Sequence, residues 1–174
     1  GENALPRDRT VGRIESIGEE KEKYLDFLSG AFGVALDGMR IAVDCANGST
    51  ADIAERLFTR LGAKCHVIGD APDGKNINER CGSTSLERLK ETVRRGEFDA
   101  GIAFDGDGDR CLAVDERGCE VDGDYIMAIL ALWKQSEGTL AKSTLVGTVM
   151  TNLGLRKFCE ENGITFKASA VGDR

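Results

Sequence analysis

The chain has 174 residues, of which 41% are hydrophobic and 30% are charged, and its formal net charge is −7. This length and composition are typical of a globular protein with one good core, and the negative charge argues against a nucleic-acid surface, which requires clustered Lys and Arg. No charged-then-apolar signal segment opens the chain, and the longest apolar run, residues 126–133, is too short to span a bilayer. We therefore expect a cytoplasmic protein with no nucleic-acid partner and no membrane partner.

Helical and strand patterns alternate along most of the chain. Residues 1–20 are polar and irregular, and we interpret them as a linker or tail. Apolar spacing and capping residues predict helices at 21–32, 85–95, 123–135 and 153–162. A further predicted helix starts in the turn 47–50 and ends at residue 61. Short apolar runs predict strands at 40–44, 64–68, 100–104, 111–115, 120–121, 144–149 and 164–170.

This order of elements predicts the fold class. Strands separated by helices favour a mostly parallel sheet, and a hairpin turn at 116–118 makes the last strand antiparallel at the edge. We expect a three-layer α/β/α domain with this mixed sheet over residues 21–121. Residues 122–174 then begin a second α/β unit, which is incomplete because it contributes only two strands.

The most informative segment is residues 105–110, Asp-Gly-Asp-Gly-Asp-Arg, at the end of the third predicted strand. Three carboxylates at alternate positions repel one another unless a cation lies between them, and oxygen ligands suit Mg²⁺ or Ca²⁺ rather than zinc. The intervening glycines let the backbone curl so that all three carboxylates reach one point. We predict that Asp105, Asp107 and Asp109 bind one divalent cation, Mg²⁺, and that Arg110 holds a phosphate.

Two other interpretations of this segment stay open. It could be an ordinary polar turn, because Asp and Gly are common turn residues. It could also be the loop of a non-enzymatic calcium-binding module, with Glu116 as the twelfth-position ligand, although Arg110 stands where such a loop needs Gly. Other chemistry is less well supported. The six cysteines form no C-x-x-C pair, the single histidine, His66, lies within a predicted strand, and no phosphate-binding G-x-x-x-x-G-K-[ST] motif is present.

The acidic loop and several other segments resemble the α-D-phosphohexomutase superfamily and, within it, the phosphoglucosamine mutase branch. The resemblance covers residues 10–174. The segments that carry it are 44–48, 76–78, 81–84, 101–105, 105–110, 121–124, 147–150, 152–155 and 171–174.

The resemblance implies the second domain and the start of the third domain of a four-domain, Mg²⁺-dependent enzyme. Such enzymes interconvert glucosamine 6-phosphate and glucosamine 1-phosphate for cell-wall precursors, through a phosphoserine and a bisphosphate intermediate. It implies a phosphosugar substrate, a catalytic and substrate-binding role for Arg110, and a substrate-facing loop that contains Asp173 and Arg174. A phosphoglucomutase or phosphomannomutase of the same superfamily is the alternative.

The same resemblance places the phosphoserine outside this chain, so we expect the chain alone to be inactive. The incomplete second unit leaves sheet edges unpaired, and we expect it to be the less stable part and prone to self-association.

Overall fold

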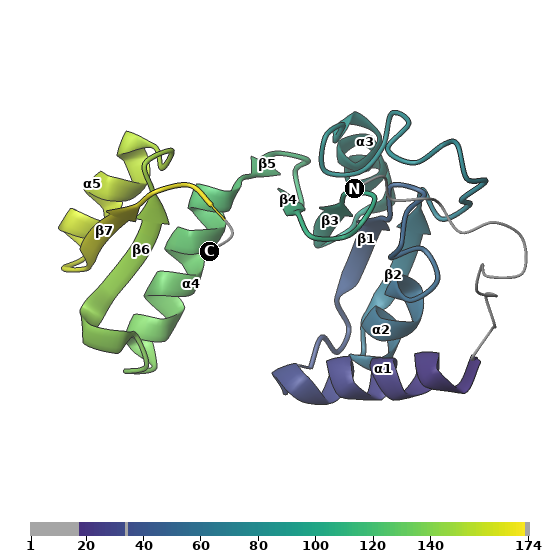
Figure 1. Cartoon of the computed structure of the whole chain (residues 1–174), viewed down its shortest axis with the longest axis horizontal. Helices are drawn as coiled ribbons and strands as arrows, with labels where there is room; N and C mark the ends of the chain where they lie inside the picture. The colour runs from purple at the N-terminus through teal and green to yellow at the C-terminus, as the bar shows by residue number, and fades with distance from the viewer. Residues whose placement is uncertain (1–17, 34, 173–174) are drawn as a thin grey trace, which may run out of the picture.

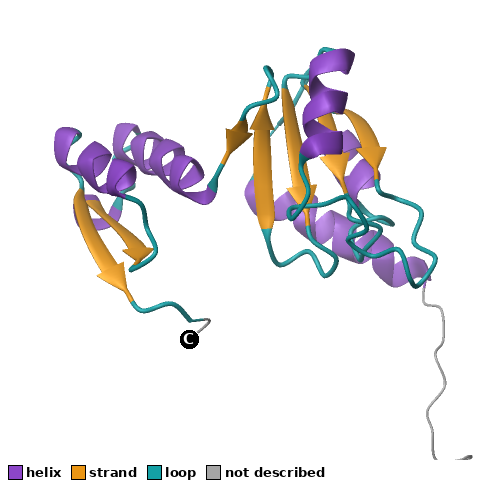
Figure 2. Ribbon diagram, turned by 90° about the horizontal axis from the view of Figure 1, so that it is seen from above, coloured by secondary structure: helices purple, strands orange, loops and turns teal. Residues whose placement is uncertain are grey.

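The computed structural model describes residues 18–33 and 35–172, and these form two α/β units (Figures 1 and 2). The larger unit contains α1 (Gly18–Phe32), β1 (Arg40–Asp44), α2 (Ala54–Arg60), β2 (Lys64–Ile68), α3 (Glu87–Gly96), β3 (Ala100–Phe104), β4 (Cys111–Asp115) and β5 (Glu120–Val121). The smaller unit contains α4 (Gly123–Ser136), a 3-10 turn (Ala141–Ser143), β6 (Thr144–Thr148), α5 (Leu153–Glu161) and β7 (Thr165–Ser169). Of the predicted tail, residues 1–17 lie outside the described residues, and residues 18–20 belong to α1.

The larger unit is built on one mixed sheet with the strand order β2-β1-β3-β4-β5. Strand β1 is parallel to both β2 and β3, whereas β4 is antiparallel to β3. The two-residue strand β5 returns beside β4 and forms the edge. The predicted mixed sheet is confirmed, and so is the predicted hairpin of β4 and β5 at its edge.

Helices cover both faces of this sheet, which gives three layers (Figure 2). On one face, Leu89 and Val93 of α3 are fully buried against Ala42 and Ala103 of the sheet. On the other face, Ala54 of α2 packs in a second cluster with the alternate residues of β1. Burial of each large aliphatic side chain contributes about 1.5–3 kcal/mol, so both helix layers are needed to stabilise β1 between them.

The first turns after β1 differ from the prediction. We expected a helix to start in the turn 47–50, but α2 begins only at Ala54 and its N-cap residue, Ile53, supplies no capping side chain. The main chain before α2 contacts the acidic loop, since the N–H of Ser49 donates a hydrogen bond to the carbonyl of Gly106. The segment between β1 and α2 instead forms single turns, with hydrogen bonds from the N–H of Ala51 to the carbonyl of Gly48 and from the N–H of Ile53 to that of Thr50, so the predicted start was wrong.

The smaller unit has only two strands, β6 and β7, which pair in parallel. Its fully buried core is small and consists of Ala131, Leu155, Cys159 and Ile164. Helix α4 leaves large apolar side chains exposed, namely Tyr125, Ile129, Leu130, Leu132 and Trp133. The predicted incomplete second α/β unit is confirmed. No helix within residues 18–33 and 35–172 combines the length and apolar character needed to cross a membrane.

We expect the amide hydrogens of β6 and β7 to exchange at least about tenfold faster than those of β1 and β3, which corresponds to a difference of about 1.4 kcal/mol. A two-stranded sheet over a small core is marginal by itself, whereas β1 is buried between two helix layers. Hydrogen exchange followed by mass spectrometry at low protein concentration measures this difference. Equal protection of residues 144–169 and 40–104 would show that the two units unfold together.

Candidate metal-binding site

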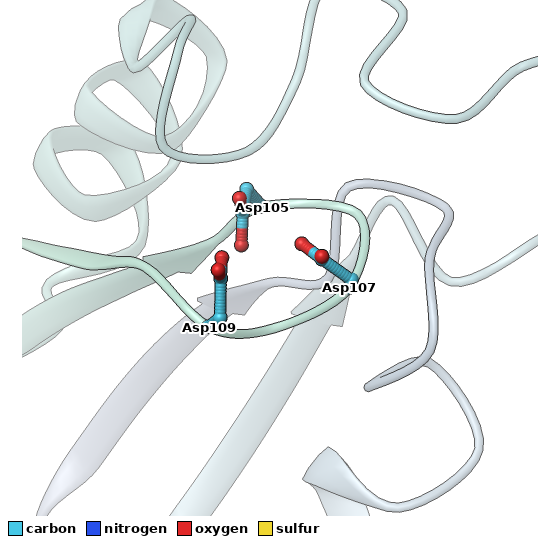
Figure 3. Close-up of side chains that lie close together, drawn as sticks. All are labelled: Asp105, Asp107 and Asp109. Atoms are coloured by element: carbon cyan, nitrogen blue, oxygen red, sulfur yellow. The ribbon is translucent and has the colours of Figure 1, made fainter. Parts of the chain in front are cut away.

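The acidic loop, residues 105–110, connects β3 to β4 at the carboxyl end of the parallel strands. The strand order 2-1-3 reverses its direction between β1 and β3, and such a switch point is where α/β proteins bind ligands. Figure 3 shows the side chains of Asp105, Asp107 and Asp109 converging on one region inside this loop. One carboxylate oxygen from each residue lies within 4.8 Å of the other two.

The three carboxylates differ in their surroundings. Asp105 is 1% exposed, whereas Asp107 and Asp109 are open to solvent. The pKa of Asp109 is raised, first by the close approach of the Asp105 carboxylate and then by the charge of Asp107. This repulsion is what a cation between the oxygens would relieve, and an all-oxygen donor set fits a hard ion such as Mg²⁺.

Asp105 is fixed by its own loop. Its Oδ1 accepts hydrogen bonds from the main-chain N–H of Gly108 and of Arg110, both at 3.2 Å, and its Oδ2 accepts one from Arg110 Nε at 2.7 Å. Burial alone would raise the pKa of Asp105, but the hydrogen bonds from Arg110 outweigh it and hold that pKa at about 2. The carboxylate is therefore ionised near neutral pH, and Oδ2 retains a lone pair for a cation.

The two glycines of the loop are needed for space and for backbone conformation. A Cβ on Gly106 would lie 2.5 Å from Cδ1 of Ile77, and a Cβ on Gly108 would lie 2.9 Å from Cγ2 of Thr50. Gly108 also has a φ of +78°, in the left-handed region that favours glycine. The alternation of Asp and Gly therefore matches a tightly packed loop rather than a free polar turn.

Neighbouring loops hold the main chain on both sides of Asp105. The N–H of Ser83 binds the carbonyl of Phe104 at 2.9 Å, and the N–H of Ser49 binds the carbonyl of Gly106 at 2.8 Å. A Cβ on Gly48 would lie 2.1 Å from that same carbonyl oxygen of Gly106, so the two loops touch through their backbones. Sequence reasoning missed these supports, because a Gly-Ser pair after a strand indicates an ordinary turn.

Arg110 lies beside the cluster with its side chain 67% exposed. Its Nε donates to Asp105, and its terminal nitrogens make no hydrogen bond within residues 18–33 and 35–172, so they are free to donate to a phosphate oxygen. Its predicted role in binding substrate stays a prediction. Asp173 and Arg174, the other predicted substrate residues, lie outside the described residues.

The geometry disfavours the calcium loop. Glu116 sits in the hairpin turn after β4, beyond the whole length of that strand. Five residues of strand span about 16 Å, so the carboxylate of Glu116 is far from Asp105 at the start of the loop. A calcium loop requires all its ligands within one twelve-residue loop between helices, and here a paired strand interrupts it.

A second hollow lies in the smaller unit, at the carboxyl ends of β6 and β7. It has a volume of about 430 Å³ and is lined in part by Asp122 and Asp124 at the start of α4 and by Thr148, Thr151 and Ser169. Two of the segments that carry the family resemblance, 121–124 and 147–150, contribute residues to its lining. Carboxylates and hydroxyls at strand ends are suited to binding a polar ligand.

Together, the three-layer unit and its acidic loop define the class of this protein as an α/β/α domain with an oxygen-rich ligand loop at its switch point. Residues 22–118 match the family model for phosphoglucomutase/phosphomannomutase, alpha/beta/alpha domain II, and residues 122–174 match the model for domain III. The chain therefore belongs to the phosphoglucomutase/phosphomannomutase family.

Curated relatives are similar over nearly the whole chain. The phosphoglucosamine mutase of Clavibacter michiganensis subsp. michiganensis is 50% identical over 170 residues, which is 98% of this chain and 39% of that protein. The phosphoglucosamine mutase of Leifsonia xyli subsp. xyli is 49% identical over 173 residues, which is 99% of this chain and 38% of that protein. The chain thus spans about two fifths of the length of these relatives.

Solved structures share the fold. A phosphoglucomutase/phosphomannomutase family protein from Burkholderia thailandensis matches with a TM-score of 0.73 at 23% identity, over 87% of this chain and 33% of that one. A putative phosphomannomutase from Thermus thermophilus matches with a TM-score of 0.69 at 18% identity, over 92% of this chain and 38% of that one. At these identities the likeness shows the fold alone.

Proposed function

We propose that this chain forms the cation-binding part of a phosphoglucosamine mutase, which interconverts glucosamine 6-phosphate and glucosamine 1-phosphate. The observation that carries the proposal is the cluster of three carboxylates at the switch point, in a chain about half identical to proteins of that name. In this proposal, Mg²⁺ is the cation, the phosphoserine that donates the phosphoryl group lies outside this chain, and a sugar bisphosphate is the intermediate of the reaction.

The residues of the loop have two roles, namely binding the cation and binding a phosphate of the substrate. Asp105, Asp107 and Asp109 would hold Mg²⁺, which when bound neutralises charge on a transferring phosphoryl group. Arg110 keeps Asp105 ionised and oriented through Nε, and its outward-facing terminal nitrogens donate to a phosphate oxygen of the substrate. Arg110 thereby couples the orientation of the buried ligand to the binding of the substrate.

Ion preference tests the cation assignment. We expect titration calorimetry of the chain to show one Mg²⁺ site and no strong preference of that site for Ca²⁺. The reason is that the ligands come from one short loop that leaves coordination positions open. A site that strongly prefers Ca²⁺ would support the non-enzymatic calcium-binding module instead. No binding of either ion would overturn the cation assignment itself.

A chimera tests whether this chain can serve as the cation-binding part of a phosphoglucosamine mutase. Residues 18–172 would replace the matching segment of the Clavibacter michiganensis relative, and the purified chimera would be assayed with glucosamine 1-phosphate, glucose 1-phosphate and mannose 1-phosphate. We expect turnover with the glucosamine substrate, while the 174-residue chain alone shows none, because phosphoryl transfer requires a positioned donor. A folded chimera without turnover of glucosamine 1-phosphate would contradict the proposal.

A further inference from the structure

Asp44, the last residue of β1, has a carboxylate that is fully buried, at 0% exposed. Its Oδ1 accepts a hydrogen bond from the main-chain N–H of Ala46 at 2.9 Å, and its Oδ2 accepts one from the N–H of Gly82 at 2.8 Å. Burial of a carboxylate is costly unless such donors compensate for the lost water. An aliphatic residue at this position would avoid that cost, so the carboxylate needs an explanation beyond packing.

One of these hydrogen bonds leads to the residue before Asp105. Gly82 is held by Asp44, and the next residue, Ser83, donates its N–H to the carbonyl of Phe104 at 2.9 Å. The contact is close, because a Cβ on Gly82 would lie 2.5 Å from that carbonyl oxygen. The position of Gly82 therefore fixes the end of β3, directly before the buried ligand.

The other hydrogen bond leads to the residue after Asp105. Ala46 and Asn47 have φ values of +53° and +49°, a conformation that non-glycine residues rarely adopt, and Asp44 Oδ1 holds the first of them. This turn delivers Ser49, whose N–H binds the carbonyl of Gly106 at 2.8 Å. Asp44 therefore stabilises both loops that grip the main chain around Asp105.

We propose that Asp44 is a positioning residue for the acidic loop. It does not touch the cation, but it connects the β1–α2 loop and the β2–α3 loop to the two carbonyls that flank Asp105. The part of this proposal that concerns Mg²⁺ affinity rests on the proposed cation site. Its effect on the metal-free loop does not depend on that site, and this allows the two proposals to fail separately.

Asp44→Asn tests the proposal, because an amide has the same shape but presents an N–H₂ group to one of the two N–H donors. We expect Mg²⁺ affinity, measured by calorimetry on folded protein, to fall about tenfold, the low end of what loss of an outer-shell partner costs. In metal-free protein we expect the amide hydrogens of Ser49 and Ser83 to exchange faster. Val114→Ala is the matched control, because it leaves a cavity in the core on β4 and so lowers stability without touching Asp44 or the loops that it holds.

The outcomes separate the alternatives. In Val114→Ala we expect unchanged Mg²⁺ affinity and no selective acceleration at Ser49 and Ser83. If folded Asp44→Asn behaves as this control does, Asp44 is merely structural and the proposal is overturned. If Asp44→Asn does not fold, Gly82→Ala interrupts the same connection, and unchanged affinity in that variant overturns the proposal equally. If the amide hydrogens of Ser49 and Ser83 exchange faster in Asp44→Asn but the wild-type chain binds no Mg²⁺, the cation assignment is wrong and the positioning role of Asp44 is supported.

Discussion

Asp107→Asn is expected to weaken Mg²⁺ binding by more than about tenfold, a loss of at least about 1.4 kcal/mol of binding free energy, while the protein stays folded. The substitution removes one of three charged ligands from a site in which one oxygen from each carboxylate lies within 4.8 Å of the other two. Asp107 is exposed, so no core contact is lost, and relief of repulsion should leave the metal-free protein at least as stable. Titration calorimetry measures the affinity, and thermal unfolding without metal measures the stability.

Glu116→Gln is the matched control for this experiment. It removes the same charge from another exposed carboxylate, in the hairpin turn beyond β4, and should leave Mg²⁺ affinity within about twofold of wild type because distant exposed charges are screened. Equal affinity of Asp107→Asn and wild type would show that Asp107 is not a ligand. An equal loss in both variants would instead indicate the calcium-loop arrangement that the strand geometry disfavours.

Gly48→Ala is expected to lower the free energy of unfolding by about 1–3 kcal/mol, the usual cost of forcing an extra methyl group into a packed site. The new Cβ would lie 2.1 Å from the carbonyl oxygen of Gly106, and neither atom can rotate away, because the Cβ is bonded directly to the main chain and the oxygen is part of it. The loop must shift, so Mg²⁺ affinity should fall as well. Denaturant unfolding and calorimetry measure the two effects.

Gly30→Ala provides the comparison, since a Cβ there meets nothing within 4 Å and the residue lies within α1. This change should stabilise the protein by about 0.5–1 kcal/mol through helix propensity. Similar small effects of the two substitutions would mean that the acidic loop can move away from Gly48 without cost, and that the contact is not part of the site's architecture.

The strands and the acidic loop could be predicted because their signals are local. Short apolar runs such as 40–44 and 100–104 indicate buried strands, and alternating Asp and Gly residues can bring carboxylates together within a single short loop. The same local reading located both units and the incomplete nature of the second, since an order of helices and strands is enough to define an α/β layer arrangement.

The supports of the loop could not be predicted, because they join residues far apart in the sequence. Asp44 binds the N–H of Gly82 across 38 positions, and Gly48 meets Gly106 only after the strands between them have paired. The late start of α2 was missed for a different reason, since the turns at residues 48–53 carry the same Gly, Ser and Thr residues that favour a helix N-terminus. Likewise, the burial of Asp105 between two loops, beside two exposed aspartates, depends on packing that local spacing does not describe.

The junction between the units is a single residue, which follows directly after β5 and caps α4. Asp122 alone separates β5 from α4, and its Oδ1 caps α4 by accepting a hydrogen bond from the N–H of Tyr125 at 2.9 Å. A helix of this length acts as a lever of about 21 Å, so a rotation of about 10° at Asp122 would carry its far end through about 4 Å. Strand β5 is paired to β4, and β4 begins directly after the acidic loop. Only the five residues of β4 therefore separate the loop from the hairpin that leads to Asp122. The acidic loop and the junction at Asp122 are thus connected through the same β4–β5 hairpin.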